Sequence, residues 1–513
     1  MQNLTTFLDN HALDPAACAL VWPAKGIRYT YAALLDRVQR LASSLSARGI
    51  SRGDRVCIFL DSCPEYLFSY FALWRIGAVA VPANIVLKEG ELGYLLQNSG
   101  ARGIICSHEG RPVVEQVKSS APFLDLAICT GDEKGGMISW DRLMEDEPVF
   151  LRPVPCGFDD PCQLQYTSGT TGRPKGAILT QGNWIAALDA EREVLGLRPN
   201  DTYLGIYPMA HVGISWGIAV LRAKGTYVIM ERFLEEEYLR IVEEYKITVL
   251  SGMPPVIHGL CHAPEGTERA LATVRVIISG GGQLLPAVWK AFDQRYNIPI
   301  ANSYGLSETI VVGSGTATLP GRPELTRGYQ SVGIPIGYTE VCIVDSSNPE
   351  KILATGETGE IALRGPSVAS GYWDMQKETT ETFLPGGWFL TGDMGYLDKE
   401  GALFITDRKK DMIIMSGWKI YPTEVENILL QHPGIADAAV FGITDERKGE
   451  IPVAAVVMKE NTMLDEQEMA AFCKSRMAGY KVPRKMFMVE ALPRVHGWKL
   501  LRRMLREEHS KNA

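Results

Sequence analysis

Residues 56–82 have the sequence VCIFLDSCPEYLFSYFALWRIGAVAVP, which indicates the fold class of the first half of the chain. The run VCIFL is short, apolar and partly β-branched, as expected of a buried strand. The segment from Tyr66 is mostly apolar, which predicts a buried helix that ends near Gly77 and is followed by a short strand. Arg75 and Pro82 interrupt this segment, and a helix that spans a membrane needs about 20 uncharged residues, so we expect no membrane span.

Similar short runs recur along the chain between longer segments of helical period. They are GIIC at 103, LAICT at 126, TYVIM at 226, ITVLSGM at 247 and VRVIISG at 274. This alternation predicts an α/β fold with layers of helices around largely parallel sheets.

The pattern changes after residue 330. GEIALRG at 359 and GALFITD at 401 contain tight Gly and Asp turns, which predict antiparallel strands. The charged stretch from Asp407 to Asp411 would be poorly accommodated inside a core and predicts a linker. Strand and helix patterns then restart at residue 423, so we expect one domain over residues 1–408 and a small α+β domain over residues 409–513.

Composition narrows the class of protein. With 513 residues and 46% hydrophobic side chains the chain can fill more than one core, and its net charge of -8 without a basic block argues against nucleic acid as a partner. The ten cysteines are scattered without zinc-ligand or redox spacing, and the first residues lack the features of a secretory signal. We therefore expect a cytoplasmic protein that acts on small molecules.

The segment YTSGTTGRPKG, residues 166–176, carries the strongest functional signal. It follows the strand-like run CQLQY and combines glycines, hydroxyl side chains and Lys175. Glycines let the backbone approach a polyphosphate, while N–H groups, hydroxyls and an ammonium group bind its oxygens. The lysine lies between Pro174 and Gly176 and not in the Gly-Lys-Ser/Thr order of a Walker A loop, so a P-loop NTPase is disfavoured.

Four further motifs follow in order: YGLSE at 304, WFLTGD at 388, Asp407-Arg408, and GWKIYPTEVE at 417. Together with the first motif they resemble the adenylate-forming superfamily of acyl-CoA synthetases, luciferases and peptide-synthetase adenylation domains, over nearly the whole chain. The resemblance is to the AMP-forming acyl-CoA synthetase branch, which implies a small β-barrel-like part in the large domain and a mobile C-terminal domain. It also implies an acid–thiol ligase that converts a carboxylic acid and ATP to acyl-AMP and pyrophosphate, and then forms acyl-CoA and AMP with coenzyme A.

The same resemblance implies which residues bind ATP or AMP. Glu308 and Thr167 would hold Mg²⁺, Asp393 would accept hydrogen bonds from the ribose hydroxyls, and Arg408 and Lys419 would meet ribose or phosphate oxygens. The expected phosphate contacts are Thr167, Ser168, Gly169, Thr170, Thr171, Gly172 and Lys175, and the expected adenine contacts are Gly281, Gly282, Gln283, Asn302, Ser303, Tyr304, Gly305 and Ser307.

The remaining site residues also come from the resemblance. His211 would line the pocket for the acid, with Trp184 and Gly282 nearby, and Lys410 would be the hinge of the mobile domain. Ser416, Gly417 and Trp418 would line the face that receives the thiol. Lys499 would be the catalytic lysine of adenylation, although Trp498 occupies the place where the family has glycine and Gly497 lies one residue early.

Two other functions stay open. One is a luciferase-like oxidative enzyme, and the other is an adenylate-binding sensor with weak catalysis, which the Trp498 departure suggests. For the acid we favour a short-to-medium-chain or cyclic monocarboxylate, because small and aromatic residues lie near His211 and Gly280 in the sequence. The sequence leaves a homodimer open as the assembly and the reaction as a reversible one.

Overall fold

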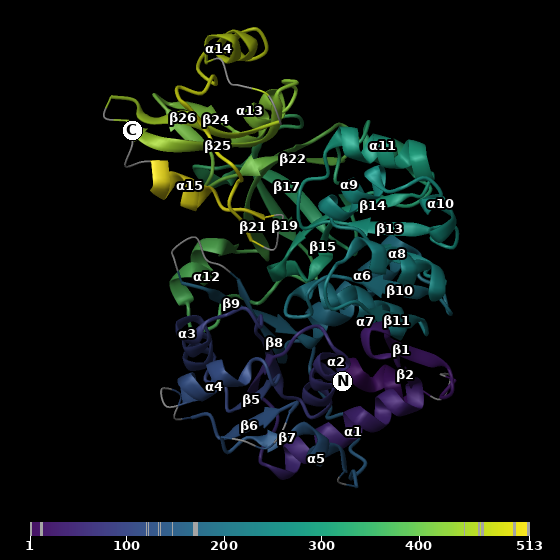
Figure 1. Ribbon diagram of the computed structural model, residues 1–513. Helices are drawn as coiled ribbons and strands as arrows, with labels where there is room; N and C mark the ends of the chain where they lie inside the picture. Colours follow the sequence, from purple (N-terminus) through teal and green to yellow (C-terminus); the bar gives the residue numbers. More distant parts are fainter. Residues whose placement is uncertain are drawn as a thin grey trace. The chain divides into compact units, whose positions relative to one another are not determined.

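A computed structural model describes residues 3–10, 14–118, 121, 123–131, 133, 135–145, 147–167, 173–445, 447–459, 462, 466–495 and 499–509. The chain forms two compact units, shown in Figure 1. The first unit holds residues 1–341 and 363–390, and the second holds residues 342–362 and 391–513. The predicted α/β class with a larger N-terminal and a smaller C-terminal part is confirmed. The boundary expected after residue 408 stays a prediction.

One sheet of the first unit carries at its edge the segment of residues 166–176, called the phosphate-loop segment below. Its seven strands have the order β7-β6-β5-β3-β4-β8-β9, with parallel pairs throughout except that β8 and β9 are antiparallel. The strands are β3 Arg55–Phe59, β4 Val79–Pro82, β5 Gly103–Cys106, β6 Leu126–Cys129, β7 Ile138–Ser139, β8 Pro161–Thr167 and β9 Lys175–Thr180. The helices of this region are α1 Tyr31–Ala47, α2 Pro64–Arg75, α3 Glu89–Ser99, α4 Arg111–Lys118 and α5 Trp140–Glu145.

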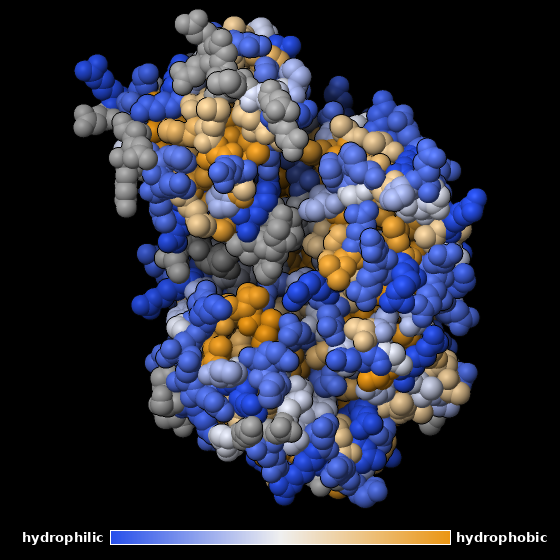
Figure 2. All heavy atoms as spheres, in the orientation of Figure 1, coloured by the Kyte–Doolittle hydropathy of each residue, from blue (hydrophilic) through white to orange (hydrophobic). Residues whose placement is uncertain are grey.

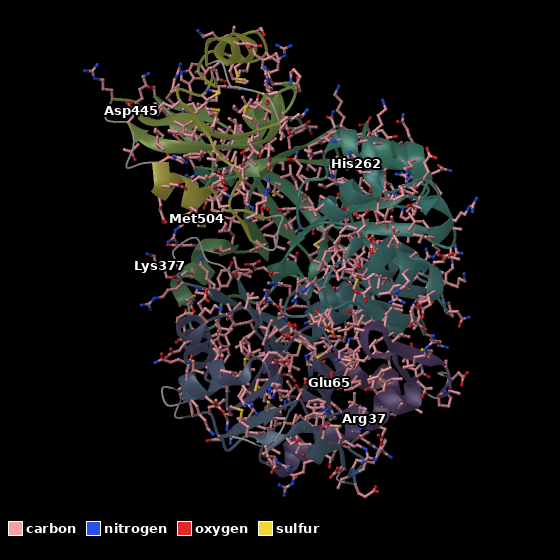
Figure 3. The ribbon with its side chains drawn as sticks, in the orientation of Figure 1. Arg37, Glu65, His262, Lys377, Asp445 and Met504 are labelled. Atoms are coloured by element: carbon pink, nitrogen blue, oxygen red, sulfur yellow. The ribbon has the colours of Figure 1, made fainter. Side chains whose placement is uncertain are left out.

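Helix α2 confirms the interpretation of residues 56–82. It begins at Pro64, with Glu65, labelled in Figure 3, in its first turn, where a carboxylate faces the positive end of the helix dipole. Nearly all of its side chains are buried, including Arg75, which forms an ion pair with Asp9 at 2.8 Å. In the part of the chain that the structure describes, no helix has the length and apolar character needed to cross a membrane.

The other large sheet of the first unit positions the expected nucleotide residues. Its order is β16-β15-β14-β13-β12-β10-β11-β1-β2. The strands are β1 Cys18–Trp22, β2 Ile27–Thr30, β10 Thr202–Gly205, β11 Thr226–Ile229, β12 Val249–Ser251, β13 Val276–Ser279, β14 Ile300–Leu306, β15 Val311–Ala317 and β16 Ile334–Pro335. The helices are α6 Gln181–Leu195, α7 Ser215–Arg222, α8 Glu235–Glu244, α9 Pro254–His262, α10 Thr267–Ala270 and α11 Pro286–Tyr296, and α12 Gln376–Thr382 precedes β20 Phe383–Leu384. Because β13 and β14 are parallel, with Ser279 opposite Asn302, the carboxyl end of β13 lies beside the middle of β14.

Most residues of the remaining strands lie in the second unit. The run GALFITD forms β22, whose pairing with β21 is antiparallel as predicted, and the run GEIALRG forms β19. β17 pairs with β18 and β21 pairs with β22, in both cases antiparallel, and a second sheet has the order β24-β23-β26-β25 with β27 beside β26. The strands are β17 Glu340–Asp345, β18 Asn348–Ile352, β19 Gly359–Arg364, β21 Trp388–Leu397, β22 Leu403–Arg408, β23 Ile413–Met415, β24 Trp418–Ile420, β25 Ile435–Asp445, β26 Gly449–Met458, β27 Met486–Met488, β28 Arg494–Val495 and β29 Lys499–Leu500. The helices are α13 Pro422–Leu429, α14 Glu466–Lys474 and α15 Arg502–His509.

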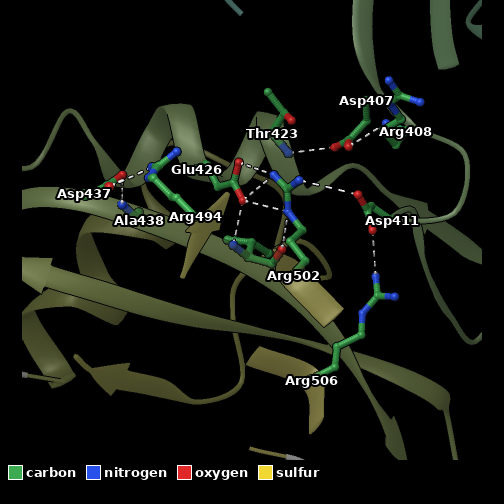
Figure 4. A network of polar contacts seen from close by, with 11 residues as sticks. Asp407, Arg408, Asp411, Thr423, Glu426, Asp437, Ala438, Arg494, Arg502 and Arg506 are labelled. Atoms are coloured by element: carbon green, nitrogen blue, oxygen red, sulfur yellow. Dashed lines mark hydrogen bonds and ion pairs between the residues drawn. The ribbon is translucent and has the colours of Figure 1, made fainter. Parts of the chain in front are cut away.

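The charged stretch that begins at Asp407 is only partly a solvated linker. Lys410 is exposed, but Asp407 is only 6% exposed and accepts a hydrogen bond from the Thr423 N–H group at 2.7 Å, at the start of α13 (Figure 4). The expectation that this stretch is poorly accommodated inside a core is therefore wrong at Asp407, because a helix N-terminus supplies an N–H donor to the buried carboxylate. Arg502 lies 2.7 Å from Glu426 and 3.5 Å from Asp411 in the same network.

Each unit has a core of buried apolar side chains. Side chains fill the spaces between the ribbons of each unit (Figure 3), and the face drawn in Figure 2 is largely hydrophilic, with separate hydrophobic groups. All ten cysteines lie in the described part of the chain and are free, and six of them are buried, as expected of small apolar side chains.

Candidate active site

The phosphate-loop segment forms a hairpin between two strands of the seven-stranded sheet. β8 ends at Thr167 and β9 begins at Lys175, and these two residues are paired across the antiparallel ladder. The strand predicted for the run CQLQY is confirmed as part of β8. The loop residues Ser168, Gly169, Thr170, Thr171 and Gly172, expected to contact phosphate, lie outside the described residues.

Glu308 lies close to the end of this hairpin. The 3-10 helix η4, Ser307–Thr309, follows β14 and carries Glu308, whose side chain is largely buried. The Thr167 hydroxyl donates to Glu308 Oε1 at 3.4 Å, so the structure brings together the two residues expected to hold Mg²⁺. Gly305 makes the approach to η4 possible, because a Cβ atom there would lie 1.6 Å from the Val311 carbonyl oxygen.

Tyr372 is a third member of this group that the sequence analysis missed. Its hydroxyl donates to Glu308 Oε1 at 3.1 Å, and the Lys175 ammonium group lies 5.0 Å from the centroid of its ring. Burial, and to a lesser degree the Glu308 carboxylate, raise the pKa of Tyr372, so its phenol stays protonated and donates at neutral pH. The only signal in the sequence was the Gly371-Tyr372-Trp373 turn, which carries no obvious charge or ligand pattern.

The donor set near Glu308 fits a hard divalent cation. One buried carboxylate and one hydroxyl offer oxygen ligands, which Mg²⁺ prefers, and water and phosphate oxygens normally complete its octahedral shell. A buried carboxylate is also costly unless charge or hydrogen bonds compensate it, and a cation supplies that charge. The residues present are therefore compatible with Mg²⁺.

The expected adenine residues lie just after β13, within β14 and at the start of η4. Gly281, Gly282 and Gln283 are exposed after β13, whereas Tyr304 is largely buried in β14. The Ser303 hydroxyl donates to the Ser279 carbonyl oxygen at 2.9 Å. The Asn302 amide donates to the Ser331 carbonyl oxygen at 3.2 Å. Asn302 and Ser303 therefore also hold neighbouring segments together, while Ser307 is half-buried at the start of η4.

The residues expected around the acid have different environments. His211 is half-buried just before the 3-10 helix η3, Val212–Ile214, and its backbone N–H group donates to the Pro208 carbonyl oxygen at 3.0 Å. Trp184 is fully buried beside Trp74, with ring centroids 4.9 Å apart. Trp184 is therefore part of the aromatic core, although its buried Nε1 has no hydrogen-bond partner among the described residues.

The second unit brings together two residues expected at the ribose. Arg408 Nε lies 2.6 Å from Asp393 Oδ1, where β21 and β22 pair. Lys419 is exposed, and its ammonium group donates to the Ser346 hydroxyl at 3.1 Å.

Of the expected thiol-side residues, Ser416 and Gly417 form the turn between β23 and β24, and Trp418 begins β24. Ser416 and Gly417 both have positive φ, of 50° and 85°, as in a type I′ hairpin turn. Trp418 is 57% exposed and stacks on Tyr480 with ring centroids 4.7 Å apart. Lys499 begins β29, but its side chain and the whole of Gly497 and Trp498 lie outside the described residues.

Comparison with known proteins shows the family to which the chain belongs. Residues 7–373 match the family of AMP-binding enzymes, and residues 424–497 match the AMP-binding enzyme C-terminal domain. A long-chain-fatty-acid–CoA ligase of Mycobacterium tuberculosis is 31% identical over 99% of both chains. A 2-succinylbenzoate–CoA ligase of Geobacillus kaustophilus is 34% identical over 93% of this chain and 92% of its own length.

Solved structures agree with the sequence relatives. The crystal structure of ATP-bound MatB from Rhodopseudomonas palustris superposes with a TM-score of 0.90, at 28% identity over the full length of both chains. The expected fold, the superfamily and the acid–CoA ligase class, with ATP, AMP and CoA as its ligands, are confirmed. The chain belongs to the family of AMP-binding enzymes.

Proposed function

We propose that this acid–CoA ligase activates a short-to-medium-chain or cyclic monocarboxylate as acyl-AMP, using Mg²⁺ and the residues described above. The observation that carries the proposal is the contact of Thr167 and the largely buried Glu308, beside the strand that begins with Lys175. This arrangement offers oxygen ligands and a cation at the end of a hairpin loop rich in Gly, Ser and Thr, which suits the polyphosphate of ATP.

In the first half-reaction the carboxylate of the acid attacks the α-phosphorus of ATP and pyrophosphate leaves. Mg²⁺, when bound, neutralises phosphate charge during this transfer. Glu308 and Thr167 hold the cation, Lys175 and the loop from Ser168 to Gly172 bind the phosphates, and Lys499 stabilises the charge that shifts as pyrophosphate departs.

The nucleoside is held by groups from two motifs. Tyr304 packs against adenine, with Gly281, Gly282, Gln283, Asn302, Ser303, Gly305 and Ser307 around it. Asp393 accepts hydrogen bonds from the ribose hydroxyls, and Arg408 and Lys419 bind ribose or phosphate oxygens.

In the second half-reaction the thiol of CoA attacks the acyl carbon and AMP leaves. Residues 409–513 turn about Lys410 between the two steps, which removes Lys499 and presents Ser416, Gly417 and Trp418 to the thiol. The exposure of Lys410 and of the hairpin turn supports this role, because a hinge and an entrance both need access to solvent.

Relatives of similar sequence identity are named for chemically different acids. Relatives of 31% to 34% identity carry names for long-chain fatty acids, 2-succinylbenzoate, crotonobetaine or carnitine, and ferulate, so identity alone selects none of them. The small and aromatic residues near His211 and Gly280 in the sequence support a small or cyclic acid, and the free cysteines support a cytoplasmic enzyme.

The reaction can also run from acyl-CoA, AMP and pyrophosphate to ATP, because each half-reaction is chemically reversible. Trp498, where the family has glycine, then alters how strongly the bound states are held, without altering the overall equilibrium. ATP synthesis from those three substrates by the native enzyme and by Trp498→Gly measures this, and no ATP at high pyrophosphate would contradict it.

A panel of acids tests the proposed function. Each acid is incubated with the enzyme, Mg²⁺-ATP and CoA, and the thioester, AMP and pyrophosphate are measured. We expect equal amounts of the three products with small aliphatic or cyclic acids. Light emission or oxygen uptake would favour a luciferase-like enzyme, and ATP binding without acid-dependent pyrophosphate release would favour a sensor.

A further inference from the structure

Residues 369–373 connect Glu308 with the strand that carries Lys175. The Ala369 N–H group donates to the Glu308 carbonyl oxygen at 2.7 Å. Ile178 of β9 exchanges hydrogen bonds with this segment, donating to Gly371 at 2.9 Å and accepting from Ser370 at 3.0 Å. The Trp373 N–H group donates to the Gly176 carbonyl oxygen at 2.8 Å. The segment is thus fixed to both the helix of Glu308 and the hairpin of the phosphate loop.

The side chain of Tyr372 makes the same connection. It is 8% exposed, its hydroxyl donates to Glu308 Oε1, and its ring lies beneath the Lys175 ammonium group. The ring also packs edge-on against Phe383, with centroids 5.3 Å apart, and the Tyr372 N–H group donates to the Thr379 hydroxyl at 2.9 Å. Backbone and ring are therefore both held, so the hydroxyl is presented to Glu308 in one orientation.

We propose that Tyr372 is a positioning residue for ATP activation, orienting the Glu308 carboxylate toward Mg²⁺ through its hydroxyl and the Lys175 ammonium group toward phosphate through its ring. The inference rests on the proposed function. A carboxylate that is already oriented loses less conformational freedom when it ligates a cation, so the hydroxyl raises cation affinity without touching the cation. The ring attracts the ammonium group through its negative face, which restrains a long and flexible side chain.

The two roles are separable because Tyr372→Phe removes only the hydroxyl. This variant keeps the ring under Lys175, whereas Tyr372→Leu removes both contacts. Tyr238→Phe is the matched control, since Tyr238 is fully buried in another part of the same unit and its hydroxyl donates to the Ser251 carbonyl oxygen at 2.7 Å. It removes a buried hydroxyl without touching the site.

The readout is ATP binding by calorimetry, titrated against Mg²⁺, with thermal unfolding in the absence of nucleotide as the measure of stability. We expect Tyr372→Phe to need roughly tenfold more Mg²⁺ for half-maximal ATP binding, the usual effect of losing a hydrogen bond to a charged group. Tyr238→Phe is expected to keep the native Mg²⁺ dependence. Tyr372→Leu is expected to bind ATP more weakly than Tyr372→Phe even at saturating Mg²⁺, because Lys175 is then also released.

Kinetics give a second and independent readout. Thioester formation from supplied acyl-AMP needs no Mg²⁺-ATP, so Tyr372→Phe should keep its native rate while the KM for Mg²⁺-ATP rises in adenylation. An unchanged Mg²⁺ dependence in Tyr372→Phe, with normal Mg²⁺-dependent ATP binding by the native enzyme, would overturn the role of Tyr372 alone. A native enzyme that binds no ATP with Mg²⁺ would overturn the proposed function as well.

Discussion

Arg408 Nε lies 2.6 Å from Asp393 Oδ1, so two residues from separate sequence motifs form one ion pair. Asp393 is almost fully buried, whereas half of the Arg408 side chain is exposed. The strands β21 and β22 place the two residues opposite each other in the ladder. The ion pair therefore orients the Asp393 carboxylate, whose oxygens are the acceptors that the proposed contact with the ribose hydroxyls requires.

Asp393→Asn tests this arrangement. The amide keeps the size of the side chain but loses the charge, and one of its two former acceptor positions becomes a donor. We expect the KM for ATP to rise about tenfold or more, as for loss of a hydrogen bond that involves a charged group. A KM for ATP within a factor of two of the native value would contradict the ribose assignment. Binding of inorganic pyrophosphate, which lacks a ribose, is the control and should stay unchanged.

Glu308→Gln tests the cation site. The substitution keeps the acceptor for Thr167 and Tyr372 on one side-chain oxygen but removes the negative charge that attracts Mg²⁺. The Mg²⁺ concentration for half-maximal adenylation should rise by roughly tenfold or more. Pyrophosphate release, measured over a series of Mg²⁺ concentrations, tests whether Glu308 is a ligand. An unaltered Mg²⁺ dependence would count against Glu308 as a ligand.

Lys499→Ala separates the two half-reactions. Its charge is needed where pyrophosphate leaves, so adenylation should slow by about 100- to 1000-fold, the usual effect of removing one group that stabilises transition-state charge. Thioester formation from supplied acyl-AMP should stay close to the native rate. Equal losses in both half-reactions would remove Lys499 from its proposed role.

The burial of Glu191 predicts that the free energy of unfolding depends on pH, independently of catalysis. The side chain is fully buried in α6, accepts a hydrogen bond from the Ser215 hydroxyl, and has no partner for Oε2 among the described residues. Burial raises the pKa of Glu191 well above its usual value. Because the folded state then binds this proton more tightly than the unfolded state, the stabilising contribution is complete below pH 4.5 and is lost as the pH rises toward the raised pKa.

Glu191→Gln removes this titration while keeping the shape of the protonated acid. We expect the variant and the native protein to have similar melting temperatures at pH 5, and the variant to be the more stable at pH 8. Each unit of pKa shift contributes about 1.4 kcal/mol to the difference once the group has ionised. Thermal unfolding at both pH values measures the effect. A constant difference between the two proteins across this pH range would show that Glu191 does not titrate as described.

Local sequence patterns predicted the elements that depend on local chemistry. The run VCIFL forms most of β3, and the apolar segment after it forms α2. Elements that are buried on all sides have continuous apolar runs, which can be recognised from the local sequence alone. Thr167 and Glu308 could be paired only through family resemblance, since 141 positions separate them.

Contacts that depend on tertiary packing could not be predicted. Tyr372 lies in a turn whose sequence contains no charged ligand, and its link to Glu308 exists only because residues 369–373 pair with β9. The burial of Asp407 could not be predicted from its neighbours in the sequence, because the N–H group that accommodates it belongs to Thr423, at the start of α13.

Oxygen-18 transfer tests the central claim, that the acid is activated on the α-phosphorus of ATP. The enzyme is given an acid labelled with oxygen-18 in its carboxylate, together with ATP and CoA, and the products are analysed by mass spectrometry. If the carboxylate attacks the α-phosphorus and CoA later displaces AMP, each molecule of AMP carries one labelled oxygen and the pyrophosphate carries none. Label in inorganic phosphate with release of ADP, or unlabelled AMP alongside the acyl-CoA product, would contradict the account.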